Sequence, residues 1–254
     1  MLSNVPDRSY LVCANQRSGS TMLCEALSGT GLAGHPEEYF LAADPEALPD
    51  WRFWEDGSPF AIEHGVHDRR SYVELVYRLG TTSNGVFGAK LMWNNVPWAV
   101  KKFQEMAEFQ VMDRSQVFAT AFPNLHVIHL ARRDLVAQAV SWARAAQDGV
   151  WHLHGDELPM PSAEPKYDFE FISNLHGLLI AGESGWRDLY EELGLVPHEL
   201  FYEDMVADPD RAVRSVLSFL GLDDRAHVPS VRTRPTADTA NAAWIERFHS
   251  DLGT

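Results

Sequence analysis

The residues best suited to chemistry form a short loop near the N-terminus, Gln16-Arg17-Ser18-Gly19-Ser20-Thr21. An apolar run at residues 10–14 precedes the loop, and a helix-like segment at residues 20–28 follows it. The free N–H groups and the positive dipole end of a helix's first turn attract anions. Gly19 allows the backbone to approach an anion closely, while the hydroxyl groups and the Arg17 guanidinium add donors. The segment therefore predicts a site for a phosphate or sulfate ester.

The loop differs from the Walker A loop of ATP-binding proteins, G-x-x-x-x-G-K-[ST]. Gly19 stands directly before Ser20, where that loop has its Lys, and no other residue of the loop is Lys. This difference weakens an ATPase interpretation and favours a nucleotide with a shorter anionic chain. The alternative is an ordinary strand-to-helix turn, in which Ser20 and Thr21 only cap the helix.

A second group of candidate residues follows a later apolar run, residues 125–130. Arg132 and Arg133 come directly after this run, Asp134 is placed to cap the next helix, and Ser141 lies about two turns into that helix. Ligands of open α/β sheets collect at the carboxyl ends of the strands, so an Arg and a Ser here suit a second phosphate. The alternative is a surface Arg pair with a Ser that faces a neighbouring element.

Composition limits the classes of protein and of partner. The 254 residues are 45% hydrophobic and 22% charged, as in a soluble globular protein, and no apolar run is long enough to span a membrane. The net charge of −15 would repel nucleic acid, so an anionic ligand needs a local cluster of arginines. Cys13 and Cys24 are the only cysteines and are expected to be buried thiols in the cytoplasm. No residues have metal-ligand spacing, and the polar N-terminus lacks a signal-peptide core.

The candidate residues need a sheet to position them, and the pattern along the chain alternates between strands and helices. This alternation predicts a P-loop-like α/β fold with a central, mostly parallel sheet flanked by helices. We expect one domain over residues 1–254, with irregular, aromatic and Pro-rich excursions at residues 41–68 and 151–165 that are candidate lids. The expected strands are residues 10–14, 85–91, 125–130 and 199–202, and the expected helices are residues 20–28, 71–79, 96–109, 135–147, 169–193 and 209–220.

Three segments, in this order, resemble the sulfotransferases that use 3′-phosphoadenosine 5′-phosphosulfate (PAPS). The loop at residues 16–21 resembles their 5′-phosphosulfate loop, and Arg132-Arg133-Asp134 with Ser141 resembles their 3′-phosphate site. The third segment, Tyr202-Glu203-Asp204 with Pro209 and Phe219-Leu220-Gly221, matches another recurring segment of these enzymes.

A closer resemblance, from Tyr10 to Phe248, is to the bacterial trehalose 2-sulfotransferase family. It is carried by three further segments: Gly34-His35-Pro36-Glu37-Glu38-Tyr39-Phe40, Gly88-Ala89-Lys90-Leu91-Met92-Trp93-Asn94 and Gln138-Ala139-Val140-Ser141-Trp142.

The resemblance implies a donor, a product and a catalytic centre. The donor is PAPS, the product is adenosine 3′,5′-bisphosphate, and the acceptor is a hydroxyl of trehalose, a related glycan or another small molecule. Glu38 matches the catalytic base, although His35 and Glu37 are close enough in sequence to leave the assignment open. Lys90 is expected to stabilise charge on the transferred group. No metal is required, and members of the family form homodimers.

Other positions carry more specific expectations. Arg133 has the eight-residue spacing to Ser141 that is usual in the wider superfamily, whereas Arg132 fits the closer bacterial pattern, so both remain candidates. Arg234, in a late basic pair, is expected to close over the nucleotide. Tyr39 and Trp93 offer flat faces for an acceptor. The excursions depart from the trehalose-specific pattern, which leaves lipid, polyketide and other glycan hydroxyls open as acceptors.

Two rival functions remain at this point. A P-loop small-molecule kinase would require ATP and Mg²⁺, and the missing Walker Lys argues against it. A non-catalytic nucleotide-binding module would bind the donor or its product without turning over any acceptor.

Overall fold

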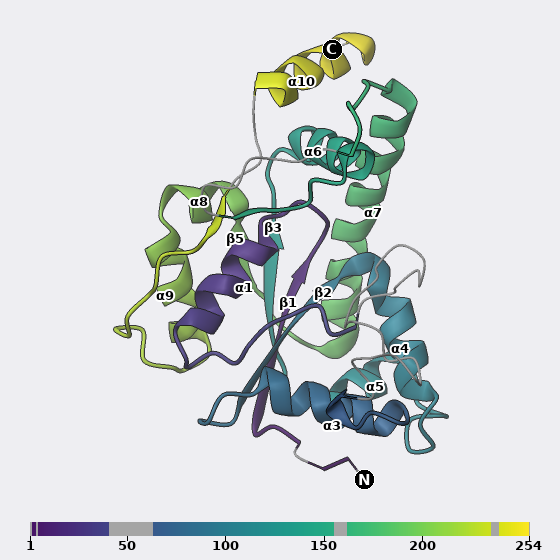
Figure 1. The fold of residues 1–254 in the computed structure, drawn as a ribbon. Coiled ribbons are helices and arrows are strands. Elements are labelled where there is room, and N and C mark those ends of the chain that lie inside the picture. Colours follow the sequence, from purple (N-terminus) through teal and green to yellow (C-terminus); the bar gives the residue numbers. More distant parts are fainter. Residues whose placement is uncertain (1, 4, 41–62, 155–161, 235–238, 254) are drawn as a thin grey trace.

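The computed structural model describes residues 2–3, 5–40, 63–154, 162–234 and 239–253. Its centre is a four-stranded parallel sheet with the strand order β2-β1-β3-β5 (Figure 1). The four strands are β1 (Arg8–Ala14), β2 (Val86–Met92), β3 (His126–Ala131) and β5 (His198–Phe201). The parallel α/β sheet expected from the sequence is therefore confirmed.

Strands β1, β2 and β3 are nearly continuous buried runs because helices cover both faces of the sheet, whereas the edge strand β5 is only partly buried. All seven residues of β2 are buried. In the parallel register, Val12 of β1 lies beside Lys90 of β2, and Cys13 lies beside His129 of β3. Side chains alternate between the two faces of a strand. Lys90 therefore shares a face with Val12, and His129 shares the opposite face with Cys13.

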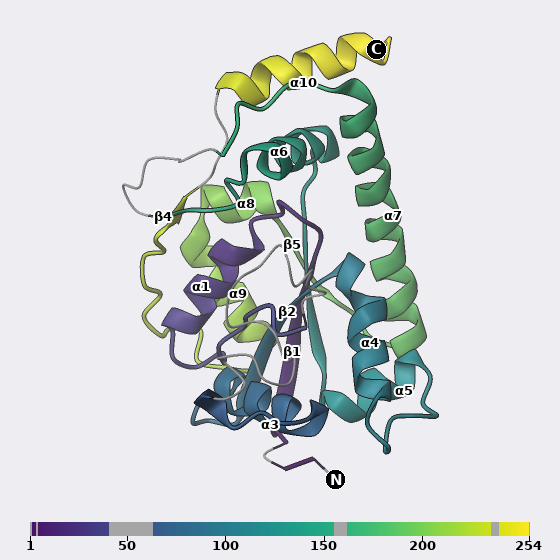
Figure 2. The same ribbon diagram turned by 45° about the vertical axis from the view of Figure 1, so that its right-hand side comes forward.

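Helices divide between these two faces (Figures 1 and 2). The helices α1 and α9 pack on the face of Val12, while α3, α4, α5 and the C-terminal half of α7 pack on the face of Cys13. The N-terminal half of α7 extends beyond the sheet and packs with α6 and α10 in a third apolar cluster. The helices are α1 (Ser20–Gly29), α3 (Arg69–Gly80), α4 (Val96–Gln104), α5 (Arg114–Ala121), α6 (Leu135–Asp148), α7 (Phe169–Leu193), α8 (Tyr202–Ala207), α9 (Pro209–Phe219) and α10 (Thr239–Asp251), with a 3-10 turn η1 (Trp93–Asn95).

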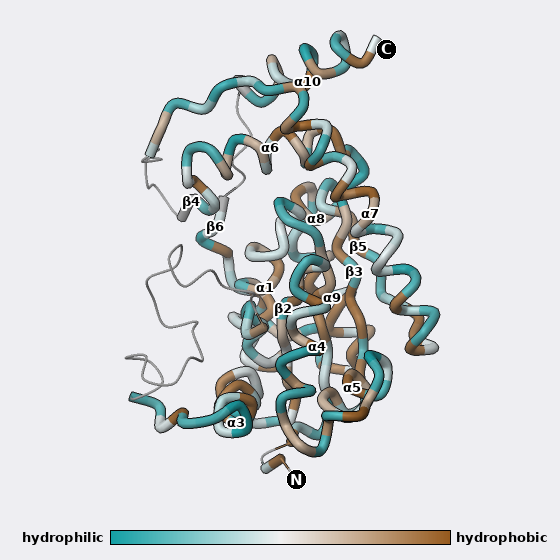
Figure 3. Tube along the Cα trace, turned by 90° about the vertical axis from the view of Figure 1, so that its right-hand side faces the viewer, coloured by the Kyte–Doolittle hydropathy of each residue, from teal (hydrophilic) through white to brown (hydrophobic). Residues whose placement is uncertain are grey.

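Two further strands lie outside the main sheet. Strand β4 (Leu153–His154) pairs antiparallel with β6 (Thr233–Arg234), which brings the chain after α6 beside the chain before α10. Hydrophobic stretches gather in β3 and the elements around it, and hydrophilic stretches are spread over the outer helices (Figure 3). In the described parts of the chain, none of the helices is both long and apolar enough to cross a membrane.

Several boundaries differ from the sequence expectation. The helix expected at residues 96–109 ends at Gln104, where turns replace it, and the strand expected at 199–202 ends at Phe201 because Tyr202 begins α8. The pattern missed α5, α8, α10 and the β4–β6 pair. Of the two expected excursions, residues 41–62 and 155–161 lie outside the described residues.

Candidate active site

The candidate anion-binding loop, residues 16–21, connects the carboxyl end of β1 to α1. Arg17 and Gly19 both have left-handed backbone conformations, with φ of 64° and 84°. A Cβ atom on Gly19 would lie 2.6 Å from the Tyr202 ring and 2.9 Å from the methyl group of Met205. Glycine is therefore required at this position by both the conformation and the packing. The first amides of α1, which have no partner within the helix, begin at Ser20 on the same loop.

Two backbone carbonyl groups of the loop accept hydrogen bonds from side chains outside it. Gln138 Nε2 donates to the Gln16 carbonyl at 2.7 Å, and Arg132 donates to the Arg17 carbonyl at 3.4 Å. The Ser18 hydroxyl and Arg132 Nε are buried without a hydrogen-bond partner among the described residues. Buried donors without partners are costly unless a ligand binds them. This arrangement fits an anionic group.

A second cluster links this loop to α6. Arg17 Nε donates to the Ser141 hydroxyl at 3.0 Å, and its guanidinium also donates to the Trp151 carbonyl. The Arg132 guanidinium lies 4.4 Å from the Tyr202 ring centre. Burial and then the neighbouring Arg132 charge lower the pKa of Arg17 to about 10. Two partly buried cations that destabilise one another favour a bound anion.

Arg133 has a different environment from Arg132. Its side chain is half exposed and forms two hydrogen bonds with Asp204, at 2.8 and 2.6 Å. Its guanidinium also stacks on the Phe201 ring at 4.3 Å, and it holds the pKa of the Asp204 carboxyl below its usual value. The structure thus brings Arg132 to the loop that contacts Ser141, and directs Arg133 to the acidic side chain of α8.

Lys90 joins a carboxylate to the candidate anion-binding loop. Its Nζ lies 3.2 Å from Glu38 Oε2 and 3.2 Å from the Thr21 hydroxyl. The side chains of Lys90 and Glu38 are only 6% and 16% exposed. A buried ion pair of this kind has a fixed geometry. The three residues come from β2, from the chain that follows α1, and from the first turn of α1.

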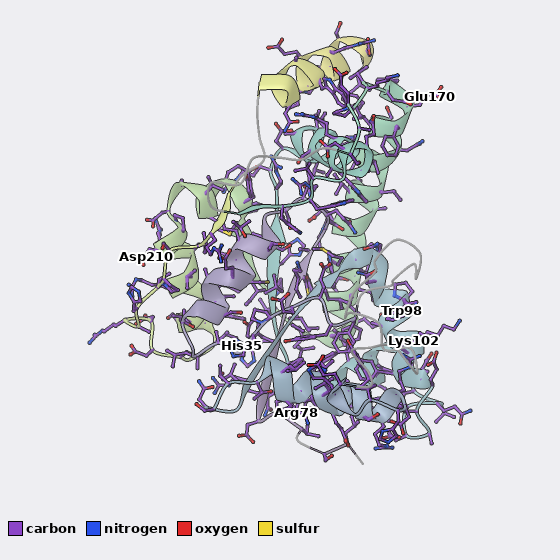
Figure 4. The ribbon with its side chains drawn as sticks, viewed as in Figure 1. His35, Arg78, Trp98, Lys102, Glu170 and Asp210 are labelled. Carbon is purple, nitrogen blue, oxygen red and sulfur yellow. The ribbon has the colours of Figure 1, made fainter. Side chains whose placement is uncertain are left out.

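Two other candidates for the base, His35 and Glu37, form no ion pair or side-chain hydrogen bond with Lys90 Nζ among the described residues; Glu37 contacts Lys90 only through its backbone carbonyl, which accepts from the Lys90 amide at 2.9 Å. Both side chains are exposed, whereas Glu38 is half-buried. The backbone of His35 donates to the Gly80 carbonyl at 2.9 Å, which places this residue at the C-terminal end of α3 (Figure 4).

The two expected acceptor-binding aromatics pack against other elements. Tyr39 is buried, stacks against Phe87 with ring centres 6.3 Å apart, and donates its hydroxyl to the His35 carbonyl at 2.8 Å. Trp93 opens η1 and packs edge-on against Trp186 of α7, with ring centres 5.3 Å apart. Only Trp93 is partly exposed.

Arg234 belongs to β6, but its side chain lies outside the described part of the structure. The segment before it is attached to α1 through Glu25. The Glu25 carboxylate accepts from the backbone of Arg232 at 2.7 Å and from the backbone and hydroxyl of Thr233 at 3.0 and 2.7 Å. Nothing in the sequence pattern indicated this role for Glu25, because it depends on contact between α1 and a distant segment.

The sequence also missed a buried polar network at the end of β1. Glu183 of α7 accepts from Asn15 Nδ2 at 2.7 Å and pairs with His129 Nε2 at 2.9 Å. The other ring nitrogen of His129 lies 2.9 Å from the Tyr190 hydroxyl. Both imidazole nitrogens are therefore engaged, on the sheet face opposite Lys90. The network holds α7 to the sheet.

These features define a class of protein. A parallel α/β sheet with a glycine-containing loop that fits an anion, beside a Lys–Glu pair, is suited to an enzyme that transfers an anionic group. The chain belongs to the Stf0 sulphotransferase family, whose sequence model matches residues 9–251. It is therefore an enzyme that transfers sulfate, and the resemblance seen in the sequence is confirmed.

Similar proteins agree with this assignment. The chain is 34% identical to the trehalose 2-sulfotransferase of Mycolicibacterium smegmatis, over 96% of this chain and 95% of the relative. It is 31% identical to the trehalose 2-sulfotransferase of Mycobacterium tuberculosis, with the same coverage of 96% and 95%. A crystal structure of a sulfotransferase from Alicyclobacillus acidocaldarius has the same fold, with a TM-score of 0.50, 12% identity and coverage of 98% of this chain and 96% of that one.

Proposed function

We propose that this enzyme transfers the sulfuryl group of PAPS to a hydroxyl of a carbohydrate, either trehalose or a related glycan. The names of the two mycobacterial relatives support the acceptor class, and the family supports the donor. One observation carries the proposal. Lys90 Nζ lies 3.2 Å from both Glu38 Oε2 and the hydroxyl of Thr21, so a half-buried carboxylate lies close to the loop that we propose binds the donor.

The donor is proposed to bind across β1 and β3. The 5′-phosphosulfate would lie against the amides and hydroxyls of the loop, with Arg17 supplying charge. The 3′-phosphate would be held by Arg132 and Ser141. The attachment of β6 to α1 by Glu25 supports the expectation that Arg234 closes over the nucleotide.

The proposed reaction is an in-line transfer. The acceptor oxygen forms a bond to sulfur while the bond from sulfur to the phosphate oxygen breaks, and adenosine 3′,5′-bisphosphate leaves. Glu38 takes the proton of the attacking hydroxyl. Lys90 orients Glu38 and, with Arg17, stabilises the negative charge on the departing oxygen.

Replacement of the base tests this function. Glu38→Gln should lower kcat for sulfation of trehalose by about 10²- to 10⁴-fold, because the acceptor hydroxyl loses its proton acceptor. The affinity for adenosine 3′,5′-bisphosphate, measured by titration calorimetry, should change little. Glu37→Gln is the matched control and should keep kcat close to the wild-type value.

Two results would contradict the proposal. Normal turnover in Glu38→Gln would remove this residue as the base. Binding of ATP with Mg²⁺ in place of the bisphosphate, or phosphorylation of the acceptor, would favour the kinase.

We further propose that the enzyme works in the cytoplasm as a homodimer. The two cysteines are unpaired and buried, which is compatible with a reducing compartment. Family membership supports the dimer, and light scattering on the purified protein tests it.

A further inference from the structure

The order of the strands separates the donor side of the site from the side open to an acceptor. The loop follows β1, the central member of three adjacent strands in the order β2-β1-β3. Arg132 and Ser141, with their bonds to the loop, lie beyond the end of β3. Lys90 and Glu38 lie at β2. A nucleotide that extends from the loop toward Arg132 therefore leaves the β2 side for the acceptor.

The Gln16 side chain points to the acceptor side. Its backbone carbonyl is bound by Gln138 from α6, on the β3 side. Its carboxamide turns the other way and donates to Asn94 Oδ1 at 2.6 Å. Asn94 lies in η1, directly after β2, and its side chain is exposed. The two carboxamides thus form a pair across the end of β2, next to Trp93.

This pair retains hydrogen-bonding groups that other residues do not use. In the part of the chain that the structure describes, Asn94 Nδ2 and Gln16 Oε1 have no partner, although each carboxamide offers both donors and an acceptor. Trp93 beside them is held edge-on by Trp186, so its orientation is fixed. A fixed indole with neighbouring carboxamides is suited to a polyhydroxylated ring, which has an apolar face and vicinal hydroxyls.

We propose that Asn94, held by Gln16, determines acceptor specificity by hydrogen bonding a sugar hydroxyl next to the one that is sulfated. This inference rests on the proposed function and refines it. The Gln16 side chain then belongs to the acceptor site, while its backbone belongs to the donor loop. Asn94 takes no part in proton transfer, so its contribution is to acceptor binding.

The test compares Asn94→Ala with Asn174→Ala, a control at an exposed Asn on α7. Asn94→Ala should raise KM for trehalose by about five- to tenfold, the effect of losing one or two neutral hydrogen bonds. The dissociation constant for adenosine 3′,5′-bisphosphate, measured by calorimetry, should stay within about twofold of wild type. Asn174→Ala should leave both constants unchanged.

Deoxy analogues of trehalose identify the hydroxyl. With the wild-type enzyme, KM for the analogue that lacks the hydroxyl bound by Asn94 should exceed KM for trehalose by the same factor by which Asn94→Ala raises KM for trehalose. With Asn94→Ala, KM for this analogue and KM for trehalose should be equal, because the hydroxyl and the carboxamide act as a coupled pair.

The outcomes separate this inference from the proposed function. The inference is overturned, and the function left standing, if Asn94→Ala leaves KM for trehalose unchanged. The same holds if it raises the dissociation constant for adenosine 3′,5′-bisphosphate as much as it raises KM for trehalose. Sulfation of simple lipid alcohols but of no sugar overturns the inference together with the carbohydrate acceptor of the proposed function, and leaves only the PAPS donor standing. A wild-type enzyme that neither binds the bisphosphate nor sulfates any acceptor overturns both.

Discussion

At the scale of single residues, the site depends on distinctions between neighbours of the same chemical type. Arg132 and Arg133 are adjacent and equally charged, yet one contacts the loop and the other is bound by Asp204. Glu37 and Glu38 are adjacent carboxylates, and of the two side chains it is that of Glu38 that pairs with Lys90 Nζ. Adjacent residues in an extended segment point in opposite directions, which accounts for both separations.

The arginine pair gives a direct prediction. Arg132→Ala should raise the dissociation constant for adenosine 3′,5′-bisphosphate about ten- to a hundredfold, because a charge-assisted hydrogen bond to the 3′-phosphate is lost. Arg133→Ala should leave it nearly unchanged, since this side chain is already paired with Asp204. Titration calorimetry measures both, and a larger effect of Arg133→Ala would reverse the assignment.

The sequence could predict the types of these residues but not which neighbour is used. The loop at residues 16–21 is identifiable because a local strand–loop–helix pattern is enough to build an anion site. The choice between Arg132 and Arg133 depends on Tyr202 and Asp204, which are distant in the chain. The carboxamide pair of Gln16 and Asn94 could not be foreseen, because it needs the register of β1 and β2.

At the scale of elements, α7 is shaped by close contacts with the site. A Cβ atom on Gly185 would lie 2.0 Å from the Trp93 ring, and one on Gly182 would lie 2.3 Å from the Asn15 carboxamide. These two glycines let the helix approach the ends of β1 and β2. Gly177, on the same helix, has open space in place of a Cβ atom.

This contrast predicts opposite effects of the same substitution. Gly185→Ala should lower the free energy of unfolding by about 1–3 kcal/mol, because the added methyl displaces the Trp93 ring. Gly177→Ala should raise it by about 0.5–1 kcal/mol through helix propensity alone. Urea denaturation followed by circular dichroism measures both, and equal effects at the two positions would contradict the packing seen here.

The elements themselves were predictable where the apolar pattern is strong. The main strands and α7 follow from buried runs and a long periodic segment. Helix α8 has six residues, and β4 and β6 have two each, so they are too short to show a period. They form because tertiary contacts, such as the bonds from Glu25 to Arg232 and Thr233, hold them in place.

At the scale of the whole molecule, the donor is expected to stabilise the fold, since its proposed contacts join β1, β3 and α6. Adenosine 3′,5′-bisphosphate at a hundred times its dissociation constant should add about 2.7 kcal/mol to the free energy of unfolding. For a chain of this size, that corresponds to a rise in Tm of roughly 5–11 °C. Thermal unfolding with and without the ligand measures it.

The control for this measurement is ATP with Mg²⁺, which should raise the Tm much less, because the loop lacks the Walker Lys. Arg132→Ala should reduce the rise caused by the bisphosphate. An equal rise with both nucleotides would show that the site does not select a 3′-phosphate.

The position of β1 in the centre of the sheet has a consequence for biosynthesis. Arg8 pairs with Val86 and Tyr10 with His126, so β1 can pair only after β2 and β3 have been synthesised. Pairings between distant segments form slowly, because a long loop must close first. A nascent chain that has emerged only as far as β2 contains the candidate anion-binding loop but neither Arg132 nor Ser141. If the proposed donor site is correct, we expect affinity for the nucleotide to arise late, when β3 joins β1, and an interrupted chain to bind the donor poorly.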